Sequence, residues 1–275
     1  MPHYSITHHT AYHFDEPLAG VKLLVCLQPL DSLFQALEFH QVVSIPLPIK
    51  RVEETDSFGN IQQHLSFRRP LQKIEVTSVS TVKVNGTRSQ LENNPDAPQW
   101  QTLFAPEELA LILPQALAFA PEVFSCDIPL RETLSQLMAK LYREFHYDEA
   151  ATTVTTPLTE LFRIKRGVCQ DFARVMIAVL QARGIDARYV SGYLFCGPLL
   201  NNRVHQAASH AWVSVFMPGS GWVDVDPTNN KWVDEEYITL AWGRDYVDVV
   251  PVKGMLNENR RQRIKVSVTI EKKPD

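Results

Sequence analysis

Three side chains that could together form and cleave an acyl bond occur in the second half of the chain: Cys169, His210 and Asp226. A cysteine thiolate attacks a carbonyl carbon, an imidazole moves the proton, and a carboxylate orients the imidazole. This requires that the fold brings the histidine and the aspartate to the thiol. If it does, these residue types predict covalent acyl transfer from an amide.

Cys169 is expected at the first turn of a buried helix. Apolar side chains form a broad stripe from Phe172 to Leu180, and Gly184 stands where a C-cap glycine belongs, so we predict a helix from about Cys169 to Arg183. The unpaired N–H groups and the positive end of the helix dipole favour a thiolate there, and these N–H groups can hold an oxyanion. Alternatively, Cys169 is a small buried apolar residue, the commonest fate of a free cysteine.

Two β-strands around a turn are predicted to carry the histidine and the aspartate. Residues 210–216 alternate, 218–221 supply the turn sequence Pro-Gly-Ser-Gly, and 222–226 alternate again, which is typical of an antiparallel hairpin. Each residue also has a structural reading. A lone histidine is more often structural than catalytic, and an aspartate before a proline could simply begin a turn.

The register of this hairpin decides whether His210 can meet a carboxylate, because a slip of one residue moves every side chain to the other face. If Phe216 pairs with Trp222, Asp226 becomes the diagonal neighbour of His210 on the same face, within reach of its side chain. Asp224 would lie further along that face. We therefore predict Asp226 as the residue that orients His210, and a loop one residue shorter would exclude this pairing.

The bulk composition indicates a globular protein without a nucleic-acid or membrane partner. The 275 residues are 45% hydrophobic and carry a net charge of -4, with no basic footprint for nucleic acid. The sequence starts on polar residues without a secretory signal and has no window of membrane-spanning length, so we expect a cytoplasmic protein. The four cysteines are far apart and form no CxxC pair, which favours reduced thiols over disulfides or zinc.

The fold class is predicted as α+β, with an N-terminal antiparallel β-sandwich or barrel over residues 1–92. Strand-like stretches occur there at 4–12, 20–27 and 74–84, and residues 56–60 supply turn chemistry. Residues 93–129 are interpreted as a linker with short helices, 130–255 as the core that carries the chemistry, and 256–275 as a C-terminal strand and tail.

Two helices are predicted before the cysteine. Apolar residues spaced by three and four over 130–145 indicate an amphipathic helix, and a second, short helix begins at Thr156-Pro157 and runs through Phe162. Both are expected to pack beside the cysteine helix. In the linker, the short apolar stretch Leu109–Leu113 is expected to end at Pro114.

A metal site is the less favoured reading of the four histidines near the N-terminus, His3, His8, His9 and His13. Only one carboxylate, Asp15, lies near them, and on a strand His8 and His9 point to opposite faces. We also see no loop with the acidic spacing of a calcium site. The sequence therefore predicts no metal and no cofactor.

Three motifs resemble the transglutaminase-like cysteine-enzyme superfamily, which shares a Cys-His-Asp core with papain-like peptidases: Gly167–Ala173, His210–Trp212 and Gly221–Asn229. Residues 4–12, 56–60, 243–246 and 248–251 resemble its bacterial branch with an N-terminal β domain. That branch is usually described as predicted cysteine peptidases, and similar sequences tend to be encoded beside ATP-grasp-type ligases. The resemblance covers nearly the whole chain.

The resemblance implies a cysteine peptidase or amidase that acts on a peptide or protein substrate through a thioester. A protein-glutamine transglutaminase shares the same acyl-enzyme, and a binding module with a vestigial site is a third possibility. The predicted substrate-binding residues are Gln170, Trp212 and Tyr246. Two residues depart from the usual pattern, which often has an acidic residue at Ala207 and a histidine at Arg174. The sequence predicts no oligomeric state.

Overall fold

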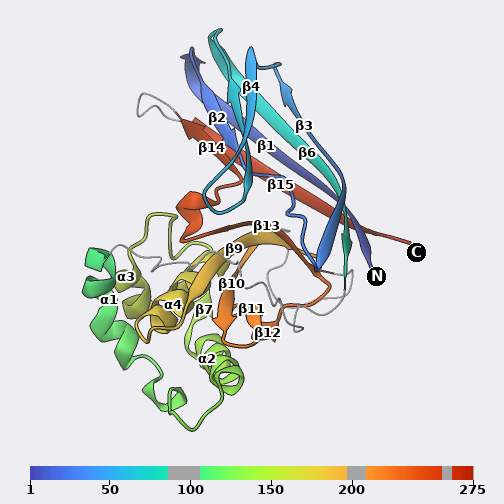
Figure 1. Ribbon diagram of the computed structural model, residues 1–275. Helices are drawn as coiled ribbons and strands as arrows, with labels where there is room; N and C mark the ends of the chain where they lie inside the picture. Colours follow the sequence, from blue (N-terminus) through green and yellow to red (C-terminus); the bar gives the residue numbers. More distant parts are fainter. Residues whose placement is uncertain (86–105, 197–208, 256–261, 275) are drawn as a thin grey trace.

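The computed structural model describes residues 1–85, 106–196, 209–255 and 262–274. A twisted β-sandwich lies above an α+β core in which helices cover one face of a five-stranded sheet (Figure 1). The two termini lie side by side, because His3 pairs with Lys273 (Figure 1). The predicted α+β class with an N-terminal β-sandwich is confirmed.

Each layer of the sandwich is a four-stranded antiparallel sheet, and each contains one strand from the C-terminal end of the chain. In β1 and β6 alternate side chains are buried, as a strand with one face on a core requires. The first sheet has the order β15(Gln262–Lys273), β1(His3–Leu18), β6(Leu71–Val84), β3(Gln35–Ile45). The second has the order β14(Val252–Met255), β2(Lys22–Val25), β5(Ile61–Ser66), β4(Lys50–Thr55).

The lower part is built on a five-stranded sheet and the buried helix α4(Cys169–Gln181). Helix α4 packs on β9 and β10, and every residue from Gln170 to Gln181 is buried. The sheet has the order β12(Lys231–Trp232), β11(Gly221–Asp226), β10(Ser209–Met217), β9(Ala187–Leu194), β13(Tyr237–Gly243). The short strands β7(His146–Tyr147) and β8(Arg166–Gly167) pair in parallel.

The remaining helices surround α4 (Figure 1). The amphipathic helix predicted over 130–145 is α2(Leu130–Glu144), and the short helix predicted from Thr156 is α3(Leu158–Ile164). Helix α1(Pro106–Ala118) continues through Pro114, where we expected it to end. Pro114 is exposed, whereas Ile112 and Ala116 are buried and α1 packs on α4, so tertiary contacts maintain the helix despite the proline. Two 3-10 turns, η1(Pro121–Val123) and η2(Tyr246–Asp248), complete the elements.

Strand β13 is an edge strand of the core sheet, and two buried amide side chains of the sandwich satisfy its outer edge. Asn60 donates to the Trp242 carbonyl at 2.7 Å and accepts the Trp242 N–H at 2.9 Å. Gln35 donates to the Thr239 carbonyl at 2.8 Å and accepts the Thr239 N–H at 2.8 Å. Each amide thus takes the place of a missing strand, and the two layers are joined by backbone recognition.

Replacing Asn60 by Ala should lower the free energy of unfolding by roughly 2 to 5 kcal/mol, since Asn60 is fully buried and both Trp242 backbone groups would lose their partner. Chemical denaturation monitored by circular dichroism measures the change. Replacing the neighbouring exposed Ser57 by Ala is the matched control and should change stability little. Equal effects of both substitutions would contradict the role given to Asn60.

His8 is a buried histidine between the sandwich and the core. Its Nδ1 lies 3.0 Å from the Tyr193 hydroxyl on β9, and its Nε2 lies 3.2 Å from the Thr10 hydroxyl. Burial, with a smaller effect of the charge on His9, lowers the pKa of His8 from 6.5 to about 4. At neutral pH the ring is therefore an uncharged hydrogen-bonding group of the interface.

Acid should destabilise the protein through His8. Because its pKa is lower in the folded state than the value of 6.5 outside it, the unfolded chain binds more protons between pH 6.5 and about 4, and stability falls as pH falls through that window. The loss from this residue reaches about 3 kcal/mol. Unfolding curves across this pH range should show a smaller acid-induced loss in His8→Gln than in the parent protein.

The same titration with Tyr193→Phe separates the effect of burial from that of the hydrogen bond to the Tyr193 hydroxyl. Because burial is the main reason for the low pKa, this variant should keep most of the acid-induced loss even without the Tyr193 hydroxyl. A parent protein and a His8→Gln variant with identical pH dependence would contradict the prediction.

Candidate active site

Cys169 begins helix α4, as the apolar pattern predicted, and the turn before it is held by Asp171. The Asp171 carboxylate accepts the Val168 N–H at 2.9 Å and the Thr152 hydroxyl at 2.6 Å. Gly167 has φ 157°, and a Cβ at this position would collide with the Asp171 carboxylate, so only glycine fits. The first-turn N–H groups of Cys169 and Gln170 have no intrahelical acceptor and are candidate oxyanion donors.

The hairpin that carries His210 and Asp226 has the predicted register. Phe216 pairs with Trp222 and Ser214 with Asp224. As a result, His210 and Asp226 are brought together, and His210 Nε2 lies 2.7 Å from Asp226 Oδ2. The histidine side chain is 8% exposed and the aspartate is completely buried.

The Asp226 carboxylate is satisfied on both oxygens. Oδ2 accepts hydrogen bonds from the Tyr237 hydroxyl at 2.8 Å and the Asn229 amide at 2.7 Å, in addition to its contact with His210. Oδ1 accepts the backbone N–H groups of Thr228 and Asn229 at 2.9 and 3.2 Å. The carboxylate is therefore held in one orientation and has only one titratable partner among these groups that can become cationic, His210.

Electrostatics favours the charged form of this pair. Burial opposes the imidazolium, but the charges of Asp226 and Cys169 and hydrogen bonds to both outweigh it and raise the pKa of His210 well above its ordinary value. Burial also opposes the Asp226 carboxylate, yet the charge of His210 and the hydrogen bonds lower its pKa. Because Asp226 occupies Nε2, the nitrogen left for the Cys169 thiol is Nδ1.

Three tyrosines are close enough to Cys169 for its charge to affect their pKa values. Burial raises the pKa of Tyr246, and the negative charge of Cys169 raises it further. The same two causes, with smaller effects of other acidic groups, raise the pKa values of Tyr147 and Tyr189. Tyr147 is 37% exposed, so it forms part of the surface beside the cysteine.

The three predicted substrate-binding residues lie in different environments. Gln170 follows Cys169 in the first helical turn and is 8% exposed, and Tyr246 is close enough to Cys169 to be affected by its charge. Trp212, however, is completely buried and donates its indole N–H to Asp224 at 3.1 Å. A side chain without exposed surface cannot contact substrate in this structure, so Trp212 is not a substrate-binding residue. Its ring instead lies beside the imidazole of His210, and the two ring centroids are 6.2 Å apart.

Of the two residues that depart from the usual pattern, Arg174 and Ala207, only Arg174 lies among the described residues. Arg174 lies on α4 at 7% side-chain exposure and donates to Asp245 at 3.1 Å and to the Thr156 carbonyl at 2.8 Å. Asp245 also accepts the Tyr246 N–H at 2.7 Å, so this ion pair ties η2 to the cysteine helix. Arg244 instead pairs with Asp248, and Ala207 lies outside the described residues.

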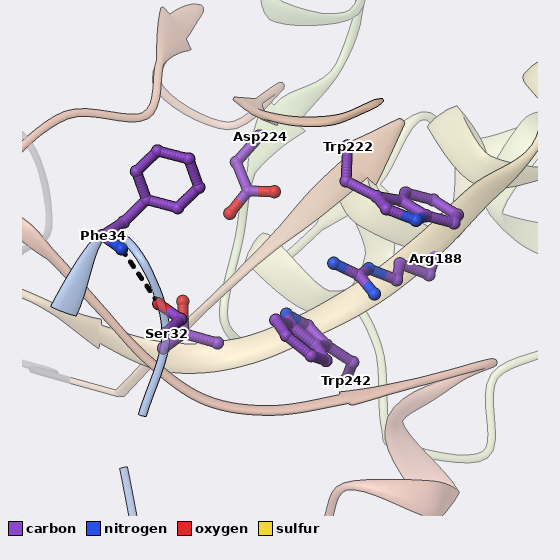
Figure 2. Close-up of a pocket in the computed structure, with 7 residues that line it drawn as sticks. Ser32, Phe34, Arg188, Trp222, Asp224 and Trp242 are labelled. Carbon is purple, nitrogen blue, oxygen red and sulfur yellow. Dashed lines mark hydrogen bonds between the residues drawn. The ribbon is translucent and has the colours of Figure 1, made fainter. Parts of the chain in front are cut away.

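A cluster of one arginine and two tryptophans on the core sheet was not predicted from the sequence. Figure 2 shows the Arg188 guanidinium between the rings of Trp222 and Trp242, which lie 4.2 and 3.8 Å away from its central carbon. Asp224 and the sandwich residues Ser32 and Phe34 line the same cavity of about 20 Å³, enough for about one water molecule (Figure 2). The sequence had placed Asp224 on the face of His210, and the same alternation along β11 could have placed Trp222 there, whereas Arg188 and Trp242 lie on β9 and β13.

Residues 118–227 match the Transglutaminase-like superfamily, and residues 4–83 match the Bacterial transglutaminase-like N-terminal region. An uncharacterized protein of Mycobacterium tuberculosis is 32% identical over 98% of this chain and 92% of its own length. The chain belongs to the transglutaminase-like superfamily.

Similarity to other proteins extends over different lengths. An uncharacterized protein of Mycobacterium leprae is 26% identical over 96% of this chain and 97% of its own. A protein-glutamine gamma-glutamyltransferase of Pseudomonas aeruginosa is 32% identical over 66% of this chain, which spans only 27% of that protein. A crystal structure of a candidate cysteine protease from Cytophaga hutchinsonii has the same fold, with a TM-score of 0.75 at 19% identity over 100% of this chain and 91% of its own.

No helix among the described residues is long and apolar enough to cross a membrane. Within the same residues no group of three or more histidine, cysteine or acidic side chains is arranged to hold a metal ion. The N-terminal histidines are used differently: His8 at the interface, as above, and His9 against Thr77 and Glu75.

Replacing Asp226 by Asn in this transglutaminase-like protein should lower the pKa of His210. Asp226 is the first of the interactions that raise it, whereas the burial that lowers it would remain. Titration of the imidazole signals by NMR measures the shift. Asp224→Asn is the matched control, since Asp224 lies on the same strand but bonds to Trp212, and the His210 pKa should hardly change. A His210 pKa unaffected by Asp226→Asn would contradict the assignment.

Proposed function

We propose that this protein is a cysteine-dependent acyl-transfer enzyme that cleaves amide or peptide bonds. The observation that carries the proposal is the 2.7 Å contact between His210 Nε2 and the buried Asp226 carboxylate, with Cys169 at the N-terminus of a buried helix and close enough to raise the pKa of His210. Members of the transglutaminase-like superfamily are typically cysteine-dependent enzymes, which supports the same conclusion. Cys169 is the proposed nucleophile, His210 the proton carrier and Asp226 the orienting residue.

The proposed first step forms a thioester. Cys169 Sγ attacks the amide carbonyl carbon while its proton resides on His210, and the carbonyl oxygen becomes an oxyanion facing the first-turn N–H groups of α4. When the C–N bond breaks, His210 gives the proton to the departing amine. Asp226 stays ionised and keeps the imidazole in place while it is charged, consistent with the raised pKa of His210.

The proposed second step releases the acyl group to water. His210 removes a proton from the water as its oxygen attacks the thioester carbon, and the C–S bond breaks to give a carboxylic acid and the free thiol. An amine at this point would give a new amide instead. The Pseudomonas aeruginosa relative, a protein-glutamine gamma-glutamyltransferase, favours keeping amine transfer as the second candidate reaction.

Replacing Cys169 by Ala should lower amide turnover by roughly 10⁴-fold or more while leaving the fold intact. A pool of peptides and simple amides, analysed by mass spectrometry, supplies the assay, and the matched control is Cys126→Ser, because Cys126 is an exposed cysteine elsewhere. Turnover by Cys169→Ala equal to that of the parent would exclude Cys169 as the nucleophile.

Alkylation by iodoacetamide tests the thiol and histidine without a known substrate. At neutral pH, Cys169 should react faster than Cys26, Cys126 and Cys196, and the His210→Ala variant should lose that preference, because no base would remain beside the thiol. Peptide mapping identifies the labelled residue. Equal labelling of all four cysteines would instead favour the binding module with a vestigial site.

Addition of a primary amine separates the two reactions. Hydrolysis gives a free acid whose yield does not depend on the amine, whereas transfer gives an amide adduct with a different mass.

The cytoplasmic location, the absence of membrane and nucleic-acid partners, and the link to ATP-grasp-type ligases stay predictions.

A further inference from the structure

Strand β15 is a long edge strand with one unpaired side. It pairs with β1 from Lys273 to Gln262 and is the last strand of its sheet, and among the described residues no strand pairs with its other side. Ten of its 12 residues are exposed. Figure 1 shows it running along the sandwich to the end marked C. Such an edge presents a row of N–H and C=O groups that can accept another strand.

The apolar side chains of β15 lie on the interior face of the sandwich, but the opposite sheet does not cover all of them. Their partners on β1 lie in the interior: Ile264 with Tyr12, Val266 with Thr10, Val268 with His8, and Ile270 with Ile6. Nevertheless Ile264 is 49% exposed and Val266 is 55% exposed. A neighbouring strand that placed apolar side chains on the same face would bury them.

We propose that β15 pairs with β15 of a second copy of this chain, antiparallel about a two-fold axis at Ser267, so that two four-stranded sheets become one. A two-fold axis perpendicular to the sheet keeps the interior faces of both copies on the same side. The strand then meets its own sequence in reverse. This pairing is therefore favourable only if the sequence of β15 is complementary to its own reverse.

The sequence of β15 complements itself in this register. Besides Ser267 opposite Ser267, the facing pairs are Val266–Val268, Lys265–Thr269, Ile264–Ile270, Arg263–Glu271 and, at the ends, Gln262–Lys272, each present twice. Apolar residues face apolar residues on the interior side, and Arg263 faces an acidic residue on the other. Arg263 is 80% exposed and its ion pair with Asp15 spans 4.0 Å, so its guanidinium is free to reach Glu271 of the second copy.

Neighbouring registers fit less well. An axis at Val268 would pair Lys265 with Glu271, but it would also place Arg263 opposite Lys273 and Ile264 opposite Lys272, so two basic residues would meet and a lysine would face an apolar residue. An axis at Val266 would place Ile270 opposite Gln262 and Arg263 opposite Thr269, so an apolar side chain would face a polar one and the Arg263–Glu271 pair would be lost. An axis between two residues would pair interior with exterior side chains, which a continuous sheet does not allow.

Basic residues on an edge strand usually prevent pairing with other chains. On β15 Arg263 has an acidic counterpart at the symmetric position, and Lys265 and Lys272 face the uncharged Thr269 and Gln262, so from Gln262 to Lys272 no two basic residues face each other.

A charge exchange tests the register. Sedimentation velocity over a series of concentrations should show a monomer–dimer equilibrium for the parent protein. Arg263→Glu and Glu271→Arg should each raise the dissociation constant roughly tenfold or more, because each variant places two pairs of like charges across the axis. The double variant Arg263→Glu/Glu271→Arg should restore the parent value to within about threefold.

Lys50→Glu is the matched control, since it changes the charge by the same amount at an exposed residue of β4. It should leave the dissociation constant unchanged, and thermal unfolding checks that every variant is folded. A parent protein that stays monomeric at all concentrations overturns the proposal. So does a dimer that is equally stable in Arg263→Glu, in Glu271→Arg and in the parent.

A disulfide locates the axis independently. With Cys126 replaced by Ser to remove an exposed thiol, Ser267→Cys should form a covalent dimer under mild oxidation, because the two copies of residue 267 face each other. Lys265→Cys should not, since its two copies would lie about 13 Å apart along the strands. Cross-linking of both variants alike, or of neither, overturns the assignment of the axis to Ser267.

Discussion

The arrangement of the site depends on the burial of one carboxylate. Asp226 has no exposed surface, so its charge must be met by hydrogen bonds or it would be protonated. Two backbone N–H groups, the Tyr237 hydroxyl, the Asn229 amide and His210 provide them. Because four of these groups hold the carboxylate without a formal positive charge, His210 is the natural place for the compensating proton. The same interaction that makes the burial tolerable thus orients the imidazole and raises its pKa.

The N-terminal sandwich is connected to this arrangement through β13. Tyr237, which holds Asp226, begins this strand, and Asn60 and Gln35 of the sandwich bind its outer edge near Trp242 and Thr239. An edge strand exposed to solvent would be free to twist or to pair elsewhere. Docking of the sandwich therefore completes the core sheet as well as covering it, and the position of the carboxylate depends in part on contacts made by the first 60 residues.

The sequence predicted the helix of Cys169 and the contact of His210 with Asp226 better than their surroundings. The helix followed from its apolar stripe and the hairpin register from period-two alternation and turn composition, which are local signals. Trp212 was misassigned because alternation gives the face of a strand and not its depth: its face is covered by Tyr237 and Val233. The Arg188 cluster and the return of β14 and β15 to the sandwich depend on contacts between residues far apart in sequence, for which periodicity carries no information.

Arg174 shows how an unusual residue can be accommodated near such a site. It is almost completely buried on the cysteine helix, where an unpaired guanidinium would be costly, and Asp245 together with the Thr156 carbonyl satisfies it. Because Asp245 also holds the backbone of Tyr246, the pair fixes a tyrosine whose pKa responds to Cys169. A histidine at this position has a shorter side chain and fewer donors, so it could not bridge the helix, η2 and residue 156 in the same way. Arg174 therefore determines how η2 and Tyr246 are held beside the cysteine helix.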